Sequence, residues 1–179
     1  MSVPTHTTPP PPIPQEVRDW VPATRTLLVG GSMVEPRGET WDVFNPATEA
    51  VIATVSGASA DQVDAAVLAA RTAFPAWAAL SGAERGAYIH RFADALEAAA
   101  DRLLPSIVNE VGTPVSLAEY LQVKMAVQEH LRWAADAAAT DRTVHLWRHE
   151  TPWPTMSDVV HEPVGVVAAI TGYNYPLNL

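Results

Sequence analysis

Residues 162–177 carry the sequence EPVGVVAAITGYNYPL, and this stretch decides the predicted fold. Within it, residues 164–170 form an apolar run rich in β-branched side chains, which begins after Pro163 and ends at a polar turn. An apolar run without alternation is typical of a strand buried on both faces, as in the middle of a parallel sheet. Because open α/β sheets bind ligands beyond the carboxyl ends of their strands, residues 171–174 are predicted to lie beside a cofactor or substrate. Pro176 suits the first turn of a following helix.

Length, charge and composition limit the possible functions. A chain of 179 residues can form an ordinary domain with a sizeable core. Its formal net charge of −9 argues against nucleic acid or an anionic membrane as a partner, since both require a basic face. No apolar segment approaches the roughly 20 residues of a membrane span. The first residues show neither a basic nor an apolar signal region, so we expect a cytoplasmic protein.

The chain contains no cysteine. Disulfides, thiolate metal sites and a cysteine nucleophile supplied by this chain are therefore excluded. His145 and His149 are four residues apart and could share one face of an element, but the only carboxylate near them in sequence is Glu150. Metal ligation is the weaker interpretation of this pair, and no metal site is predicted.

Before the decisive stretch, the chain is predicted to begin with a proline-rich tail and then alternate hairpins and helices. Residues 1–25 form the tail and lead-in, for which solvated polyproline II is favoured over an SH3-type ligand. Gly30 and Gly31 predict a tight turn between two short strands within residues 27–34. Residues 41–48 alternate and end in an Asn-Pro turn, and residues 51–55 predict one more short strand.

Three capping boxes predict the starts of helices. The serine of each box precedes a Gln or Glu by three residues, as in Ser59–Gln62, Ser81–Glu84 and Ser116–Glu119. The last box opens a long helix to about residue 139, and a shorter helix over residues 103–111 closes at Gly112. Two of these helices carry apolar stripes: Val63, Val67, Ala70, Phe74 and Trp77 on the first, and Ile89, Phe92, Leu96 and Ala99 on the second.

Two strands follow the helices, over residues 143–147 and 157–161. Trp147 and Trp153 lie on or between them. Large aromatic side chains on a projecting strand pair would suit a protein interface. Covering this chain's own core is an equally good interpretation.

The stretch EPVGVVAAITGYNYPL resembles the E-P-x-G-V-x-x-x-I-x-P-W-N-[FY]-P signature of the NAD(P)-dependent aldehyde dehydrogenase superfamily. It departs at Gly172, where proline is usual, and at Tyr173, where tryptophan is usual. The glycine pair of the first hairpin and the turn NPATEA are also similar to features of this family, and the sequence VGTP stands where its TGKP usually lies.

The resemblance implies an α/β fold, specifically the N-terminal part of the family's coenzyme-binding, Rossmann-like domain. Its hairpins and four-helix block would occupy residues 26–140, and residues 141–162 would form part of an oligomerisation arm. Residues 163–179 would hold the first parallel strand and the turn with the oxyanion asparagine. An independent helical bundle is the weaker alternative.

Asn174 is the predicted catalytic residue. Its amide offers two donors, and a donor fixed at the end of a strand could stabilise an oxyanion. In the family, the matching asparagine holds the thiohemiacetal oxygen after a cysteine attacks the aldehyde. Hydride then passes to the nicotinamide of NAD or NADP, and water hydrolyses the thioester. An asparagine that merely orders the turn before Pro176 is the alternative.

Ile170, Thr171, Gly172 and Tyr173 match family positions that line the cofactor, while core and turn packing is their alternative role. The family's cysteine nucleophile and glutamate base lie downstream of this motif. We therefore expect an aldehyde-oxidising enzyme represented by a truncated or split chain that is inactive alone. Its partners would be the aldehyde and further copies or a C-terminal chain. A non-catalytic module that pairs with a complete subunit is the alternative function.

Overall fold

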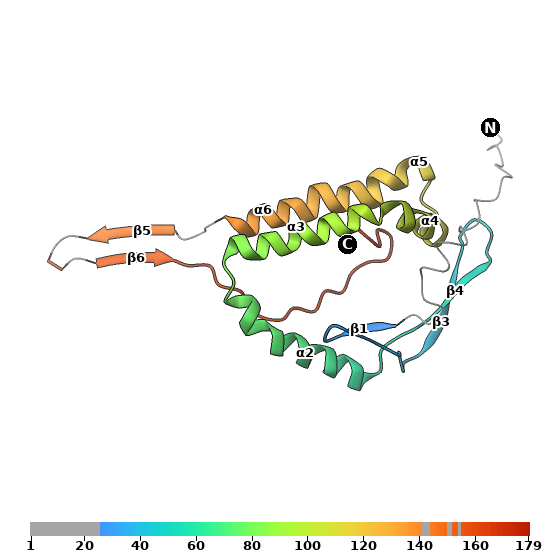
Figure 1. Cartoon of the computed structure of the whole chain (residues 1–179), viewed down its shortest axis with the longest axis horizontal. Coiled ribbons are helices and arrows are strands. Elements are labelled where there is room, and N and C mark those ends of the chain that lie inside the picture. Colours follow the sequence, from blue (N-terminus) through green and yellow to red (C-terminus); the bar gives the residue numbers. More distant parts are fainter. Residues whose placement is uncertain (1–25, 141–143, 150–151, 154) are drawn as a thin grey trace.

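The computed structural model describes residues 26–140, 144–149, 152–153 and 155–179, and for residues 145–149 it describes the backbone only. The predicted tail over residues 1–25 lies outside this part, as do the side chains of His145, Trp147 and His149. Three two-stranded antiparallel sheets accompany a block of helices (Figure 1). None of the described helices is long and apolar enough to cross a lipid bilayer.

The first two hairpins follow the predicted turns. Strands β1 (Leu27–Val29) and β2 (Ser32–Val34) pair across Gly30 and Gly31, whose φ values of 58° and 82° suit glycine. Strands β3 (Thr40–Phe44) and β4 (Val51–Ser56) pair through the Asn-Pro turn. Asn45 orders that turn, because its Oδ1 accepts hydrogen bonds from the N–H groups of Ala47 and Thr48.

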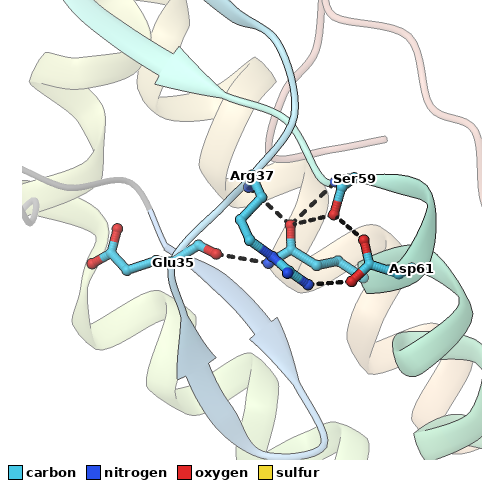
Figure 2. Close-up of polar contacts among 5 residues, drawn as sticks. Glu35, Arg37, Ser59 and Asp61 are labelled. Carbon is cyan, nitrogen blue, oxygen red and sulfur yellow. Dashed lines mark hydrogen bonds and ion pairs between the residues drawn. The ribbon is translucent and has the colours of Figure 1, made fainter.

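The loop that follows β2 forms hydrogen bonds with the N-terminus of helix α2 (Ala60–Ala78) (Figure 2). The predicted capping box is confirmed, since the Ser59 N–H donates to Gln62 Oε1 at 3.1 Å. The same buried Gln62 accepts from the Arg37 N–H at 2.9 Å and donates to the Glu35 carbonyl at 2.6 Å. Arg37 also forms an ion pair with Asp61. A hydrogen bond from Ser59 lowers the pKa of Asp61, and the Arg37 charge acts in the same direction.

The helical block contains α3 (Gly82–Ala98), α4 (Ala100–Val111) and one long helix built from α5 (Val115–Ala118), η1 (Glu119–Leu131) and α6 (Arg132–Ala139). Helix α3 runs antiparallel to α6, with Gly82 beside Ala138 and Gly86 beside Ala135. Ala93, Val123 and Val127 form the buried core between α3 and η1. The middle section η1 is π-helical over 13 residues, whereas π geometry is usually confined to single turns.

Two predictions about these helices need correction. The long helix starts at Val115 after Pro114, so Ser116 lies inside it and caps nothing. On α3 the buried face carries Gly86 and Ala93 in place of the predicted Phe92, which is exposed. The reason is the close approach of α6 at Gly86 and of η1 at Ala93, which favours small side chains on that face. The capping box at Ser81 and Glu84 and the helix end at Gly112 are confirmed.

Strands β5 (Val144–His149) and β6 (Thr155–Val159) pair antiparallel, which confirms the predicted strand pair. Their hairpin projects away from the helical block (Figure 1). Trp153, in the loop between them, is 77% exposed. In this chain it does not cover the core.

The strand predicted over residues 164–170 is not formed. Residues 160–172 have no regular secondary structure, and Val164, Val167 and Ile170 are exposed. A strand requires a neighbour to accept and donate its backbone hydrogen bonds, and no described strand lies beside this segment. The segment instead passes between α2 and the layer of α3 and α6 (Figure 1). The prediction of a paired strand over residues 164–170 is therefore wrong for this chain.

Candidate active-site turn

Residues 173–179 form a turn that carries Asn174. The Leu179 N–H donates to the Tyr175 carbonyl at 2.9 Å, which closes one helical turn around Pro176. This geometry agrees with the prediction that Pro176 stands in the first turn of a helix. Residues 171–179 contain no charged side chain. The turn therefore offers hydrogen-bond donors and acceptors, and its titratable side chains are the phenols of Tyr173 and Tyr175.

Side chains of η1 fasten this turn to the helical block. Leu177 packs against the core cluster of Ala93, Val123 and Val127. Asn178 makes two contacts, because its Oδ1 lies at hydrogen-bond distance from His130 Nδ1 and its Nδ2 donates to Met125 Sδ at 3.3 Å. The far end of the turn is thus held by one apolar and two polar contacts.

Gln122 on η1 holds the near end of the turn. Its side chain is buried, with a residue exposure of 1%. Its Nε2 donates to Thr113 Oγ1 at 3.2 Å and to the Asn174 carbonyl at 3.4 Å. Its Oε1 is buried and has no hydrogen-bond partner among the described residues.

The sequence analysis did not single out Gln122, although a signal was present. Ala118, Gln122 and Ala126 recur at intervals of four residues on one helix, and all three are buried. A polar side chain in an otherwise apolar, buried stripe indicates a specific partner.

The predicted site residues are consecutive in the chain, at the start of the turn and directly before it, and all of them are exposed. Ile170 is 97% exposed and Tyr173 is 89% exposed, while Thr171, Gly172 and Asn174 are also accessible. The Asn174 side chain folds toward Gly172, since a Cβ atom added there would lie 3.3 Å from Asn174 Oδ1. An accessible amide on an anchored turn can donate to an incoming oxyanion.

Two hollows border the segment that leads to this turn, and neither is lined by residues 170–174. The first has a volume of 670 Å³ and lies between the start of α3, the end of α6 and residues 161–163. The second has a volume of 410 Å³ and is lined by Val67, Arg71 and Phe74 of α2 together with residues 165–168. Because residues 170–173 are all exposed, they do not enclose a dinucleotide by themselves.

One carboxyl group near the end of α4 has a perturbed pKa. Partial desolvation raises the pKa of Glu110, whose side chain still reaches solvent. By contrast, a hydrogen bond from Ser81 lowers the pKa of Glu84, which agrees with its predicted capping role. Neither group belongs to the turn at residues 173–179.

Comparison with known proteins identifies the class to which this fold and turn belong. The model of the aldehyde dehydrogenase family matches residues 33–179, so the chain belongs to this family. The resemblance predicted from residues 162–177 is thereby confirmed.

Individual relatives support the same assignment. The chain is 33% identical over 156 residues to a geranial dehydrogenase from Castellaniella defragrans, covering 86% of this chain and 32% of that protein. A betaine aldehyde dehydrogenase from Staphylococcus aureus, solved in complex with NAD+, superposes with a TM-score of 0.78 at 28% identity and covers 91% of this chain and 32% of its own. Aldehyde dehydrogenase C from Pseudomonas syringae, complexed with NAD+ and octanal, matches with a TM-score of 0.64 at 34% identity, over 71% of this chain and 26% of that one.

These matches confirm the predicted fold class as the N-terminal part of an aldehyde dehydrogenase structure. The chain spans between about a quarter and a third of the length of these relatives.

Proposed function

We propose that this chain is the N-terminal portion of an enzyme that oxidises an aldehyde to a carboxylic acid with NAD or NADP. Membership of the aldehyde dehydrogenase family supports the reaction class. The observation that carries the proposal is the anchored turn of residues 173–179, which presents the Asn174 amide to solvent while its two ends are fixed to η1. One relative named above, aldehyde dehydrogenase C, was solved with NAD+ and octanal, which supports the choice of substrate and cofactor.

The proposed role of Asn174 is to stabilise the oxyanion that forms when a nucleophile adds to the aldehyde carbonyl. Its side-chain amide can donate a hydrogen bond to that oxygen, and a donor held in place before the reaction needs no reorganisation. The anchoring contacts at Gln122 and Leu177 supply this rigidity.

Turnover requires groups that this chain does not contain. The family mechanism uses a cysteine nucleophile, and the chain has no cysteine. We therefore propose that the chain is inactive alone and that a complementary C-terminal part supplies the nucleophile and the general base. The exposed apolar side chains of residues 164–170 support this view, because such surface is normally covered.

The cofactor site needs the complementary part as well. Residues 170–173 lie open to solvent and form no enclosing cavity, so they do not fit a dinucleotide by themselves. We propose that they contribute one wall of a site that closes only in the assembled enzyme. A cytoplasmic location remains a prediction.

One assay tests the proposed function. The chain is purified and mixed with the C-terminal part of an aldehyde dehydrogenase such as the geranial dehydrogenase relative, and NAD(P)H production is followed with a medium-chain aldehyde. We expect no turnover from the chain alone and measurable turnover from the mixture. Asn174→Ala should lower kcat of the mixture by roughly a hundredfold, the usual effect of removing one oxyanion donor.

A matched control separates chemistry from folding. Gln128→Ala changes an exposed amide on the same helix η1 that anchors the turn and should leave kcat unchanged. Turnover by the isolated chain would contradict the claim that its catalytic groups lie elsewhere. Full turnover by the Asn174→Ala mixture would contradict the oxyanion role.

A second candidate function is an interaction module that pairs with a complete subunit. The projecting β5–β6 hairpin supports it, because Trp153 and Met156 are both exposed there (Figure 1). In this case the chain would bind a full-length relative without supporting turnover, and Trp153→Ala would weaken that binding. The same hairpin could join copies of the completed enzyme. Sedimentation of the chain with and without a full-length relative separates these outcomes from the first proposal.

A further inference from the structure

We propose that Gln122 is a positioning residue, which sets the direction of the Asn174 side chain by holding its backbone carbonyl on η1. The inference rests on the proposed role of Asn174 and adds a residue that acts through it. The sequence motif of residues 162–177 does not include Gln122, which is separated from it by helix α6 and the β5–β6 hairpin.

The burial of Gln122 is the first argument. A residue that is 1% exposed, between buried Ala118 and Ala126, would stabilise the fold better with an apolar side chain of similar volume. The amide instead leaves its Oε1 buried and without a partner in the described part of the chain. A buried polar atom without a partner is uncommon in folded proteins and calls for a specific explanation.

The two hydrogen bonds that Gln122 Nε2 donates supply this explanation. One reaches Thr113, in the short connection between α4 and α5, and the other reaches the Asn174 carbonyl. Gln122 therefore links two segments that are far apart in sequence. The contact to the main chain of Asn174 fixes the residue itself, whereas the contacts of Leu177 and Asn178 fix only the far end of the turn.

The π-helical geometry of η1 is consistent with this assignment. Gln122, Met125 and His130 all lie on η1, and each contacts residues 174–178. Single-turn π-bulges inside α-helices are frequent at functional sites. Here the π-helical segment is the one whose side chains hold the turn that carries Asn174.

The test replaces Gln122 with methionine, which keeps the length and volume of the side chain and removes the donor. In the 179-residue chain, hydrogen exchange of the Leu179 amide should become roughly fivefold faster, because its acceptor, the Tyr175 carbonyl, is adjacent to the released residue Asn174. The midpoint of global unfolding should stay the same or rise, since the orphaned oxygen is removed as well. Gln128→Met, at an exposed position of the same helix, should change neither quantity.

A second measurement uses the chain mixed with its complementary part. Gln122→Met should lower kcat by roughly tenfold without changing KM, because it disturbs a donor that acts in the transition state. Combined with Asn174→Ala, it should cause no additional loss, as expected when one residue acts through the other.

The results separate this inference from the proposed function. If the unaltered mixture shows no turnover, the proposed function fails, and the exchange experiment still decides whether Gln122 holds the turn. Unchanged exchange in Gln122→Met, or faster exchange together with a lower global midpoint, would overturn the positioning role. Losses in kcat that multiply in the double variant would overturn it too.

Discussion

The helical block and the C-terminal segment are both rich in apolar side chains, yet only the block buries them. In the block, Val127 is 1% exposed between α3 and η1. In residues 164–170, Val164 is 93% exposed, although its segment is at least as apolar as the helices. Hydrophobicity therefore predicts what is buried in the completed structure, while the neighbours that are present decide what this chain buries by itself.

The difference follows from where each element finds its hydrogen bonds. A helix satisfies its backbone groups within one continuous segment, so the block needs only side-chain packing between helices. A central strand depends on two neighbouring strands for the same purpose. Residues 164–170 have no described strand beside them and stay irregular.

The largest expected effect tests the packing inside the block. Gly86 lies so close to α6 that an added Cβ would come within 2.7 Å of the Ala135 carbonyl oxygen. Gly86→Val should therefore lower the free energy of unfolding by about 3 kcal/mol, as in other overpacked cores. Ala87→Val introduces the same side chain at the adjacent, exposed position and should cost only a few tenths of a kcal/mol, roughly its loss of helix propensity. Chemical denaturation measures both, and equal effects would show that α3 and α6 are not closely packed.

The next prediction compares a valine-to-alanine substitution in the helical block with the same substitution in residues 164–170. Val127→Ala removes buried methyl groups and should cost about 2 kcal/mol. Val167→Ala, at a position that is 72% exposed, should leave the stability of the chain almost unchanged. Repeating both measurements in the mixture with the complementary part sharpens the comparison, because Val167→Ala should then weaken the assembly. A substantial cost of Val167→Ala in the chain alone would show that the segment is already packed.

The smallest expected effect concerns the local capping of α3. The Ser81 N–H and hydroxyl donate to the Glu84 carboxylate, and the pKa of Glu84 is lower than usual. Because the folded-state pKa is depressed, this contribution to stability is present above the unfolded pKa of about 4.3 and is lost as the pH falls through the folded-state value.

Glu84→Gln keeps a side chain that can form a capping box. The free energy of unfolding should then fall slightly less steeply as the pH is lowered below about 4. Asp64→Asn on α2, an exposed residue that makes no capping box, serves as the control. An unchanged profile in Glu84→Gln would show that the capping carboxylate contributes no pH dependence.

The local features of the fold could be predicted from the sequence, and so could the family. The Gly30–Gly31 turn, the capping boxes at Ser59 and Ser81 and the helix end at Gly112 depend on residues adjacent in sequence, and the structure confirms them. The start of the long helix was predicted two residues late, because its N-cap is Pro114, which has no side-chain cap, and not Ser116.

The candidate site was only partly predictable. The motif indicates Asn174 and residues 170–173 by resemblance, but it contains no information on what holds them. Gln122 reaches the turn only because η1 passes beside it, and Thr113 joins the same contact from a third segment. Hydrogen bonds between distant segments do not follow from periodicity or capping rules.

The sequence by itself determined the positions of turns and helix ends, the absence of a cysteine and the aldehyde dehydrogenase motif, since each depends on residues close together in the chain. Only the tertiary structure decided that Phe92 faces solvent, that Gln122 is buried beneath the Asn174 turn and that residues 164–170 pair with no described strand. The physical reason is the same in all three cases. Burial and pairing depend on the surface that another segment brings alongside, and that surface is set by how the segments fold together.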